Sequence, residues 1–147
     1  MLRISVLVSG GGTNLQAIID GIESGFIQEA EIVLVVSSNP NAYALERAKK
    51  HKIPSVVIDK AKYPDKDTRT KAIISALDLA KTDLVVLAGY MSILEPEMVD
   101  AYRGRIINIH PSLIPQFCGV GFYGKRVHAA VLAAGVPESG ATVHYVD

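Results

Sequence analysis

The sequence predicts an α/β protein built on an open, doubly wound, mostly parallel sheet with helices on both faces. Short apolar segments alternate with segments in which apolar residues recur every three or four positions, which is typical of successive βα units. The segment Leu84–Ala88 is apolar throughout, as a central strand covered on both faces requires. We found no internal repeat or linker, so we expect one continuous domain over residues 1–147.

The first βα unit shows how the pattern is assigned. Leu2–Val8 is the first predicted strand, and a glycine-rich turn leads from it into a helix over about residues 14–24. Between Leu15 and Ile22 the apolar residues recur at helical spacing and form one buried face. Gly25 ends the helix, since glycine readily adopts the backbone conformation found just after helices.

The remaining elements follow the same alternation of strands and helices. In chain order they are a strand over 32–36, a helix over 42–51, a strand over 53–58, a polar stretch over 59–69 leading into a helix that ends at 80, the central strand over 84–88, a short helix over 95–102, a strand over 106–110, a helix over 125–134 and a strand over 142–146. Between the last two of these strands, residues 111–124 are rich in glycine and proline and form a candidate substrate loop.

Composition excludes several classes of partner. Fifteen basic and fifteen acidic residues give a formal net charge of zero, so no overall field attracts nucleic acid or an anionic membrane. No apolar run approaches the ~20 residues of a membrane helix, and the N-terminus does not resemble a signal peptide. The single cysteine, Cys118, indicates a reducing compartment. We therefore expect a soluble, cytoplasmic protein without nucleic-acid or membrane partners.

The strongest chemical signal is the pair Asn108 and His110 at the end of a predicted strand. Side chains at positions i and i+2 of a strand share a face, so both can point into one crevice. A carboxamide donor beside a group that titrates near neutrality suits acyl transfer, in which a carbonyl oxygen gains charge while a proton moves. The structural alternative, a histidine hydrogen-bonded to backbone, stays open.

A second signal is the glycine-rich turn between the first strand and the first helix, Ser9 to Asn14. Its backbone N–H groups and the helix dipole favour a phosphate, although Thr13 or Asn14 could instead cap the helix without any ligand. The dinucleotide fingerprint fails because Leu15 stands where its last glycine belongs, and a Walker lysine is missing. Nicotinamide oxidoreductases and nucleoside triphosphatases are therefore disfavoured.

Four sequence blocks, in this order, resemble phosphoribosylglycinamide formyltransferase of purine biosynthesis. They are Ser-Gly-Gly-Gly-Thr-Asn-Leu-Gln-Ala at 9–17, Leu-Ala-Gly-Tyr-Met at 87–91, Asn-Ile-His-Pro-Ser-Leu at 108–113 and Gly-Ala-Thr-Val-His-Tyr-Val at 140–146. The resemblance covers essentially the whole chain and implies the Rossmann-like formyltransferase fold.

The resemblance also implies a reaction and a set of site residues. The reaction is transfer of a formyl group from the co-substrate 10-formyltetrahydrofolate to the amine of glycinamide ribonucleotide, without a metal. The implied residues are Asn108 and His110 for catalysis, Gly12, Thr13 and Asn14 for the substrate phosphate, Lys66, Met91, Ser92, Ile93, Leu94 and Asn108 for the folate, and His144 in a supporting role.

Three departures from the family pattern, and a catalytic block that other formylfolate enzymes share, leave alternatives open. Family members usually carry arginine where Ser92 and Lys66 stand, and the family's catalytic aspartate lies beyond the position of Asp147. We therefore expect residues 1–147 to lack the C-terminal part of the family fold. The alternatives are a catalytically impaired binder of nucleotide phosphate, or another enzyme that uses 10-formyltetrahydrofolate, either a deformylase or methionyl-tRNA formyltransferase. A homodimer is an open alternative to a monomer.

Overall fold

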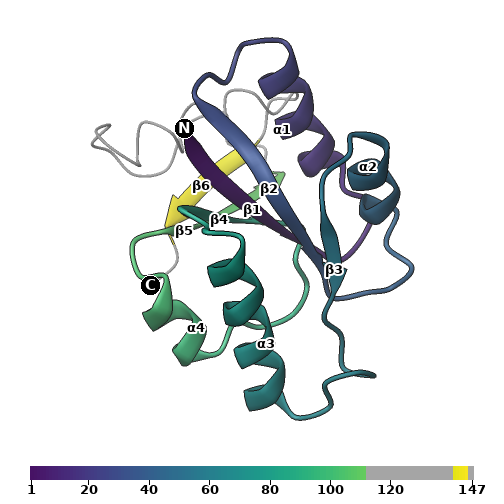
Figure 1. Ribbon diagram of the computed structural model, residues 1–147, viewed down its shortest axis with the longest axis vertical. Coiled ribbons are helices and arrows are strands. Elements are labelled where there is room, and N and C mark those ends of the chain that lie inside the picture. The colour runs from purple at the N-terminus through teal and green to yellow at the C-terminus, as the bar shows by residue number, and fades with distance from the viewer. Residues whose placement is uncertain (112–140, 146–147) are drawn as a thin grey trace.

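The structure is a computed structural model that describes residues 1–111 and 141–145, with side chains described for residues 1–109. Six strands form one sheet in the order β3-β2-β1-β4-β5-β6 (Figure 1). The strands are β1 (Leu2–Val8), β2 (Ala30–Ser37), β3 (Ser55–Val57), β4 (Leu84–Ala88), β5 (Ile106–Pro111) and β6 (Ala141–Tyr145). The helices are α1 (Thr13–Glu23), α2 (Ala44–Lys50), α3 (Lys66–Leu79) and α4 (Pro96–Ala101).

The pairing of the strands confirms the predicted fold class. Strands β1 to β5 pair in parallel, and β6 pairs antiparallel with β5 at the edge of the sheet. Strand β4 lies between β1 and β5 and is buried along its whole length, as its uniformly apolar sequence predicted.

Helices cover both faces of the sheet, α1 and α2 on one face and α3 and α4 on the other (Figure 1). Alternate residues of β1 divide between these two layers. Ile4 and Val6 pack into the cluster that contains Leu15 of α1, whereas Leu7 packs into the cluster that contains Leu77 of α3. This two-sided burial is the reason that the strand sequences are apolar runs.

Four strands differ from their predicted bounds. Strands β5 and β6 differ by one residue at an end, and β2 and β3 differ more. Strand β2 begins at Ala30, two residues earlier than predicted, because its pairing with β1 already starts with Leu2 opposite Ala30. Strand β3 is limited to Ser55–Val57 instead of 53–58. Pro54 has no N–H to contribute to a ladder, although its carbonyl accepts a hydrogen bond from the Val35 amide at 2.9 Å.

The four described helices begin at other residues than predicted, α1 and α4 by one residue and α2 and α3 by more. Helix α3 starts at Lys66, inside the stretch predicted to be polar and irregular, because the Asp65 carboxylate caps it by accepting the Thr68 amide at 2.8 Å. Helix α2 starts at Ala44 and not at Ala42, since the Ala42 amide closes a turn on the Asn39 carbonyl at 3.2 Å.

Several predictions fall on residues outside the described part of the chain. They are the loop after Pro111, the helix over 125–134, Cys118 and the last residues from Val146 on. Strand β6 begins at Ala141, one residue before the predicted 142. Within residues 1–111 and 141–145, none of the helices has both the length and the apolar character that crossing a membrane demands.

Candidate active site

The carboxyl ends of β1, β4 and β5 meet at one edge of the sheet, because these strands are parallel neighbours. Each is followed by a segment that the sequence singled out. The Met91 amide donates to the Ser9 hydroxyl at 2.8 Å, and the Asn14 side-chain amide donates to the Ile109 carbonyl at 3.5 Å. The structure thus brings the glycine turn, the segment after β4 and the Asn108 strand together.

The glycine turn enters α1 through Gly12, which is the N-cap residue and has a φ of 78°. A Cβ atom at Gly12 would lie 2.7 Å from the Cβ and 2.9 Å from the Cα of Ala44 in α2. Both the backbone conformation and the packing therefore require glycine here. The alternative in which Thr13 or Asn14 caps the helix is wrong, because the cap position falls on a residue without a side chain and Thr13 is already helical.

Helix α2 holds the carbonyl side of this turn. The Gly10 carbonyl accepts from the Ala44 amide at 3.1 Å, and the Gly11 carbonyl accepts from Nε of Arg47 at 2.7 Å. Among the described residues, the backbone N–H groups of residues 10–15 donate to no acceptor. They sit at the positive end of α1, so the turn offers free donors for an anion.

Asn108 lies on β5 between two other strands of the sheet. Its backbone is in register with Leu87 of β4 on one side and with His144 of β6 on the other. The Asn108 side chain is half-buried, between the fully buried Ile107 and Ile109. His110 follows in register with Thr142. The backbones of His110 and His144 are described, and their side chains lie outside the described part of the structure.

The segment after β4 presents apolar side chains to solvent. Met91 is 82% exposed and Ile93 is 87% exposed, whereas Ser92 and Leu94 are half-buried. Large apolar side chains exposed together are typical of a surface that binds a ligand. Burial raises the pKa of the neighbouring Tyr90 hydroxyl, and a hydrogen bond with the Ser92 side chain partly offsets this rise.

Lys66 lies at the first turn of α3, and its ammonium group is 3.7 Å from a carboxylate oxygen of Glu95. This ion pair joins the start of α3 to the N-cap residue of α4, close in sequence to the Met91 segment. The Lys66 side chain is 67% exposed, so its charge is accessible to an anionic group in solution.

The structure also adds Arg47 and Ser38, which sequence reasoning did not assign to the site, and it gives a partner to Ser9 at the start of the predicted turn. Arg47 holds the glycine turn, and Ser9 and Ser38 join the ends of β1 and β2 through hydroxyls 2.5 Å apart. The available signal was weak, because a serine after an apolar strand is common. The partners of Ser9 follow neighbouring strands, so they can be identified only when the order of the strands in the sheet is known.

The fold and the site define a class of α/β protein in which a glycine-rich turn at a helix N-terminus, a carboxamide and an exposed apolar segment meet at one edge of a parallel sheet. Residues 2–147 match the family model described as formyl transferase. The chain therefore belongs to the formyl transferase family.

The relatives in this family are enzymes of purine biosynthesis. The chain is 43% identical over its whole length to phosphoribosylglycinamide formyltransferase of Haemophilus influenzae and spans 66% of that protein. It is 46% identical over 99% of its length to the trifunctional purine biosynthetic protein adenosine-3 of Drosophila pseudoobscura pseudoobscura, of which it spans 10%.

Solved structures agree with these sequence relatives. Glycinamide ribonucleotide transformylase 1 from Geobacillus kaustophilus matches the whole chain with a TM-score of 0.78 and 41% identity, and the chain covers 75% of it. The chain thus spans from about a tenth to three quarters of the length of the proteins that it matches here.

Proposed function

We propose that the protein transfers the formyl group of 10-formyltetrahydrofolate to the amine of glycinamide ribonucleotide, with residues 1–147 acting as one domain. The observation that supports this most is the convergence of three segments at one sheet edge: the glycine turn, the segment around Met91 and the strand that contains Asn108. These segments differ in chemistry, and each suits a different part of the two substrates. The names of the relatives favour the same reaction.

In this proposal the glycine turn binds the phosphate of the ribonucleotide. The free N–H groups of Gly12, Thr13 and Asn14 donate to phosphate oxygens at the positive end of α1. The Asn14 side chain, which contacts the Ile109 carbonyl, ties this turn to the strand of Asn108. Phosphate and reacting amine are then held at a fixed separation, which is how positioning lowers the barrier of a reaction between two substrates.

The folate would bind along the segment after β4. Met91 and Ile93 offer exposed apolar surface to a flat ring system, and Ser92 and Leu94 complete the segment. Lys66 is the cation proposed for a folate carboxylate. It binds as a point charge without the two-pronged geometry of arginine, and the carboxylate would compete with Glu95 for it.

The proposed chemistry uses Asn108 and His110 as a unit. The ribonucleotide amine attacks the formyl carbon, a new C–N bond forms, and the carbonyl oxygen becomes an oxyanion that accepts a hydrogen bond from the Asn108 amide. His110, as imidazolium, stabilises this charge and donates a proton to the folate nitrogen as the old C–N bond breaks. The proton lost by the attacking amine restores the imidazolium. His144, opposite Asn108 in the sheet, is proposed to support this pair.

The direct test compares three acceptors for the formyl group under the same conditions: glycinamide ribonucleotide, methionyl-tRNA and water. We expect tetrahydrofolate release that depends on the ribonucleotide. Formate release without any ribonucleotide would instead indicate a deformylase. Ligand-induced thermal stabilisation without turnover would indicate a binder of nucleotide phosphate. Either result would contradict the proposal.

A further inference from the structure

Three loops at the carboxyl edge are joined by one side chain, that of Ser9. Its hydroxyl accepts the Met91 amide at 2.8 Å and lies 2.5 Å from the hydroxyl of Ser38. Ser9 directly follows β1, Ser38 directly follows β2, and Met91 lies three residues beyond β4. We call this arrangement of Ser9, Ser38 and the Met91 amide the serine clasp.

The hydrogen-bonding capacity of a hydroxyl fits the clasp. A serine hydroxyl has one proton to donate and two lone pairs to accept with. Accepting the Met91 amide uses one lone pair of Ser9 and leaves its proton available to Ser38. Ser38 is itself anchored, because its backbone amide donates to the Val8 carbonyl at 3.0 Å. Ser9 is only 9% exposed, so the side chain has little freedom to swing away.

Among the described residues, Ser9 is the side chain that binds the Met91 amide. The chain leaves β4 through Gly89, which has a φ of 72° and is exposed, and the Met91 side chain is 82% exposed. Tyr90 and Leu94 pack against the core on either side of Met91, whereas the Met91 amide itself is placed by the hydrogen bond to Ser9. That bond joins residues 82 positions apart, directly beside the start of the glycine turn.

We propose that Ser9 is a positioning residue that sets the place of residues 91–94 relative to the glycine turn, and so the fit of the folate beside the ribonucleotide. The inference rests on the proposed function, since it assigns the two sides of the clasp to the two substrates. Ser9 acts through the Met91 backbone and touches neither substrate.

The experiment compares Ser9→Ala with Ser5→Ala in the full-length protein. Ser5 is a matched control because it is a fully buried serine of the same β1 region, and its hydroxyl bonds Thr82 at 2.7 Å away from the carboxyl edge. For Ser9→Ala we expect KM for 10-formyltetrahydrofolate to rise about three- to tenfold, the factor that corresponds to one lost hydrogen bond, with kcat and KM for the ribonucleotide within about twofold. Ser5→Ala should leave both KM values unchanged.

A third variant and a second readout separate positioning from a general loss of stability. Ser38→Ala keeps the acceptor for Met91 and removes only its neighbour, so we expect a smaller rise in the same KM. Hydrogen exchange of the Met91 amide should accelerate in Ser9→Ala and stay at the wild-type rate in Ser5→Ala.

Two results would overturn the inference. The first is a KM for 10-formyltetrahydrofolate in Ser9→Ala that stays within about twofold of wild type. The second is a KM for 10-formyltetrahydrofolate that rises as much in Ser5→Ala as in Ser9→Ala. If the wild-type protein transfers no formyl group, the proposed function fails. Hydrogen exchange of the Met91 amide still tests whether the serine clasp holds the segment. Equal Met91 exchange in wild type and Ser9→Ala would then show that Ser9 does not hold this segment.

Discussion

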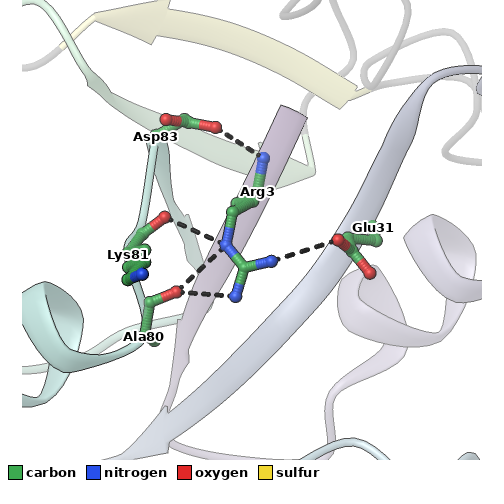
Figure 2. A network of polar contacts seen from close by, with 5 residues as sticks. All are labelled: Arg3, Glu31, Ala80, Lys81 and Asp83. Carbon is green, nitrogen blue, oxygen red and sulfur yellow. Dashed lines mark hydrogen bonds and ion pairs between the residues drawn. The ribbon is translucent and has the colours of Figure 1, made fainter. Parts of the chain in front are cut away.

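The two ends of the sheet differ in how far their polar groups are hydrogen-bonded within the chain. At the amino-terminal end, Arg3 of β1 is the centre of a network of internal hydrogen bonds (Figure 2). Its guanidinium donates to the Ala80 carbonyl at 2.9 Å, to the Lys81 carbonyl at 3.2 Å and to Glu31 at 3.3 Å, while its backbone amide donates to Asp83 at 2.9 Å. At this end of the sheet, the donors of Arg3 are therefore bonded to groups of the same chain.

At the carboxyl end, Ser9, Ser38 and Arg47 are bonded within the chain, but one set of backbone donors has no partner among the described residues. The N–H groups of residues 10–15 have no acceptor among the described residues, and Met91 and Ile93 expose large apolar side chains. A network satisfied within the chain stabilises the fold, whereas donors and apolar side chains that face solvent are available to a ligand. Substitutions at the two ends should therefore separate stability from activity.

The largest expected effect is on activity, from Asn108→Ala at the carboxyl end. Removing the amide that donates to the oxyanion should lower kcat for formyl transfer about 10²- to 10³-fold. The free energy of unfolding should change by less than about 1 kcal/mol, because the side chain is only half-buried. Steady-state kinetics and urea denaturation of the same preparation measure both. A decrease in kcat below about tenfold would contradict the role assigned to Asn108.

Gly12→Ala is an exception to this separation, because Gly12 lies at the carboxyl end and is nevertheless needed for the stability of the fold. The new methyl group would meet Ala44 at 2.7 Å, and the backbone φ of 78° is strained for alanine. We expect the free energy of unfolding to fall by about 2–4 kcal/mol in urea denaturation. In the matched control Gly11→Ala the new methyl group meets no atom within 4 Å. A similar loss in both variants would show that the contact with α2 is not the cause.

Arg3→Ala tests the amino-terminal end. The loss of several guanidinium hydrogen bonds should lower the free energy of unfolding by about 1–3 kcal/mol and leave the KM values and kcat unchanged. Glu31→Gln removes only the exposed ion pair of the same network, and it should cost less than about 1 kcal/mol. If Arg3→Ala altered KM for either substrate, the separation between the two ends of the sheet would be lost.

The smallest effect is expected from Asp65→Asn, at the start of α3. Hydrogen bonds from the Thr68 amide and hydroxyl hold the pKa of the Asp65 carboxyl below its ordinary value of 3.8. Since the folded pKa lies below the unfolded one, the stabilisation is present above about pH 3.8 and is lost as the pH falls through the folded pKa. Urea midpoints across this acid range should fall less steeply for Asp65→Asn than for wild type. If the urea midpoints of the two proteins fell in parallel with pH, the Asp65 cap would not be the cause of the acid loss of stability.

Local sequence was sufficient for most of the elements and for the identity of the segments at the site. The apolar run over 84–88 predicted a central strand, and Ser9 to Asn14 predicted a strand-to-helix turn, because backbone conformation depends mainly on neighbours along the chain. The helix start at Lys66 was missed, although the Asp65 cap was present in the sequence. The roles assigned to Asn108, His110, Lys66 and His144 stay predictions that the experiments above test.

By itself, the sequence determined which stretches of the described residues are strands and helices, that the sheet is mostly parallel, and which segments follow the strands at its carboxyl edge. Only the tertiary structure decided that β6 pairs antiparallel with β5, that α2 forbids a side chain at Gly12, and that Ser9 holds the Met91 amide. The physical reason is that periodicity and turn chemistry are local, whereas apolar burial is non-directional. The sequence of a buried strand does not identify the strand that it pairs with. Contacts between distant residues are therefore decided only when the whole sheet assembles.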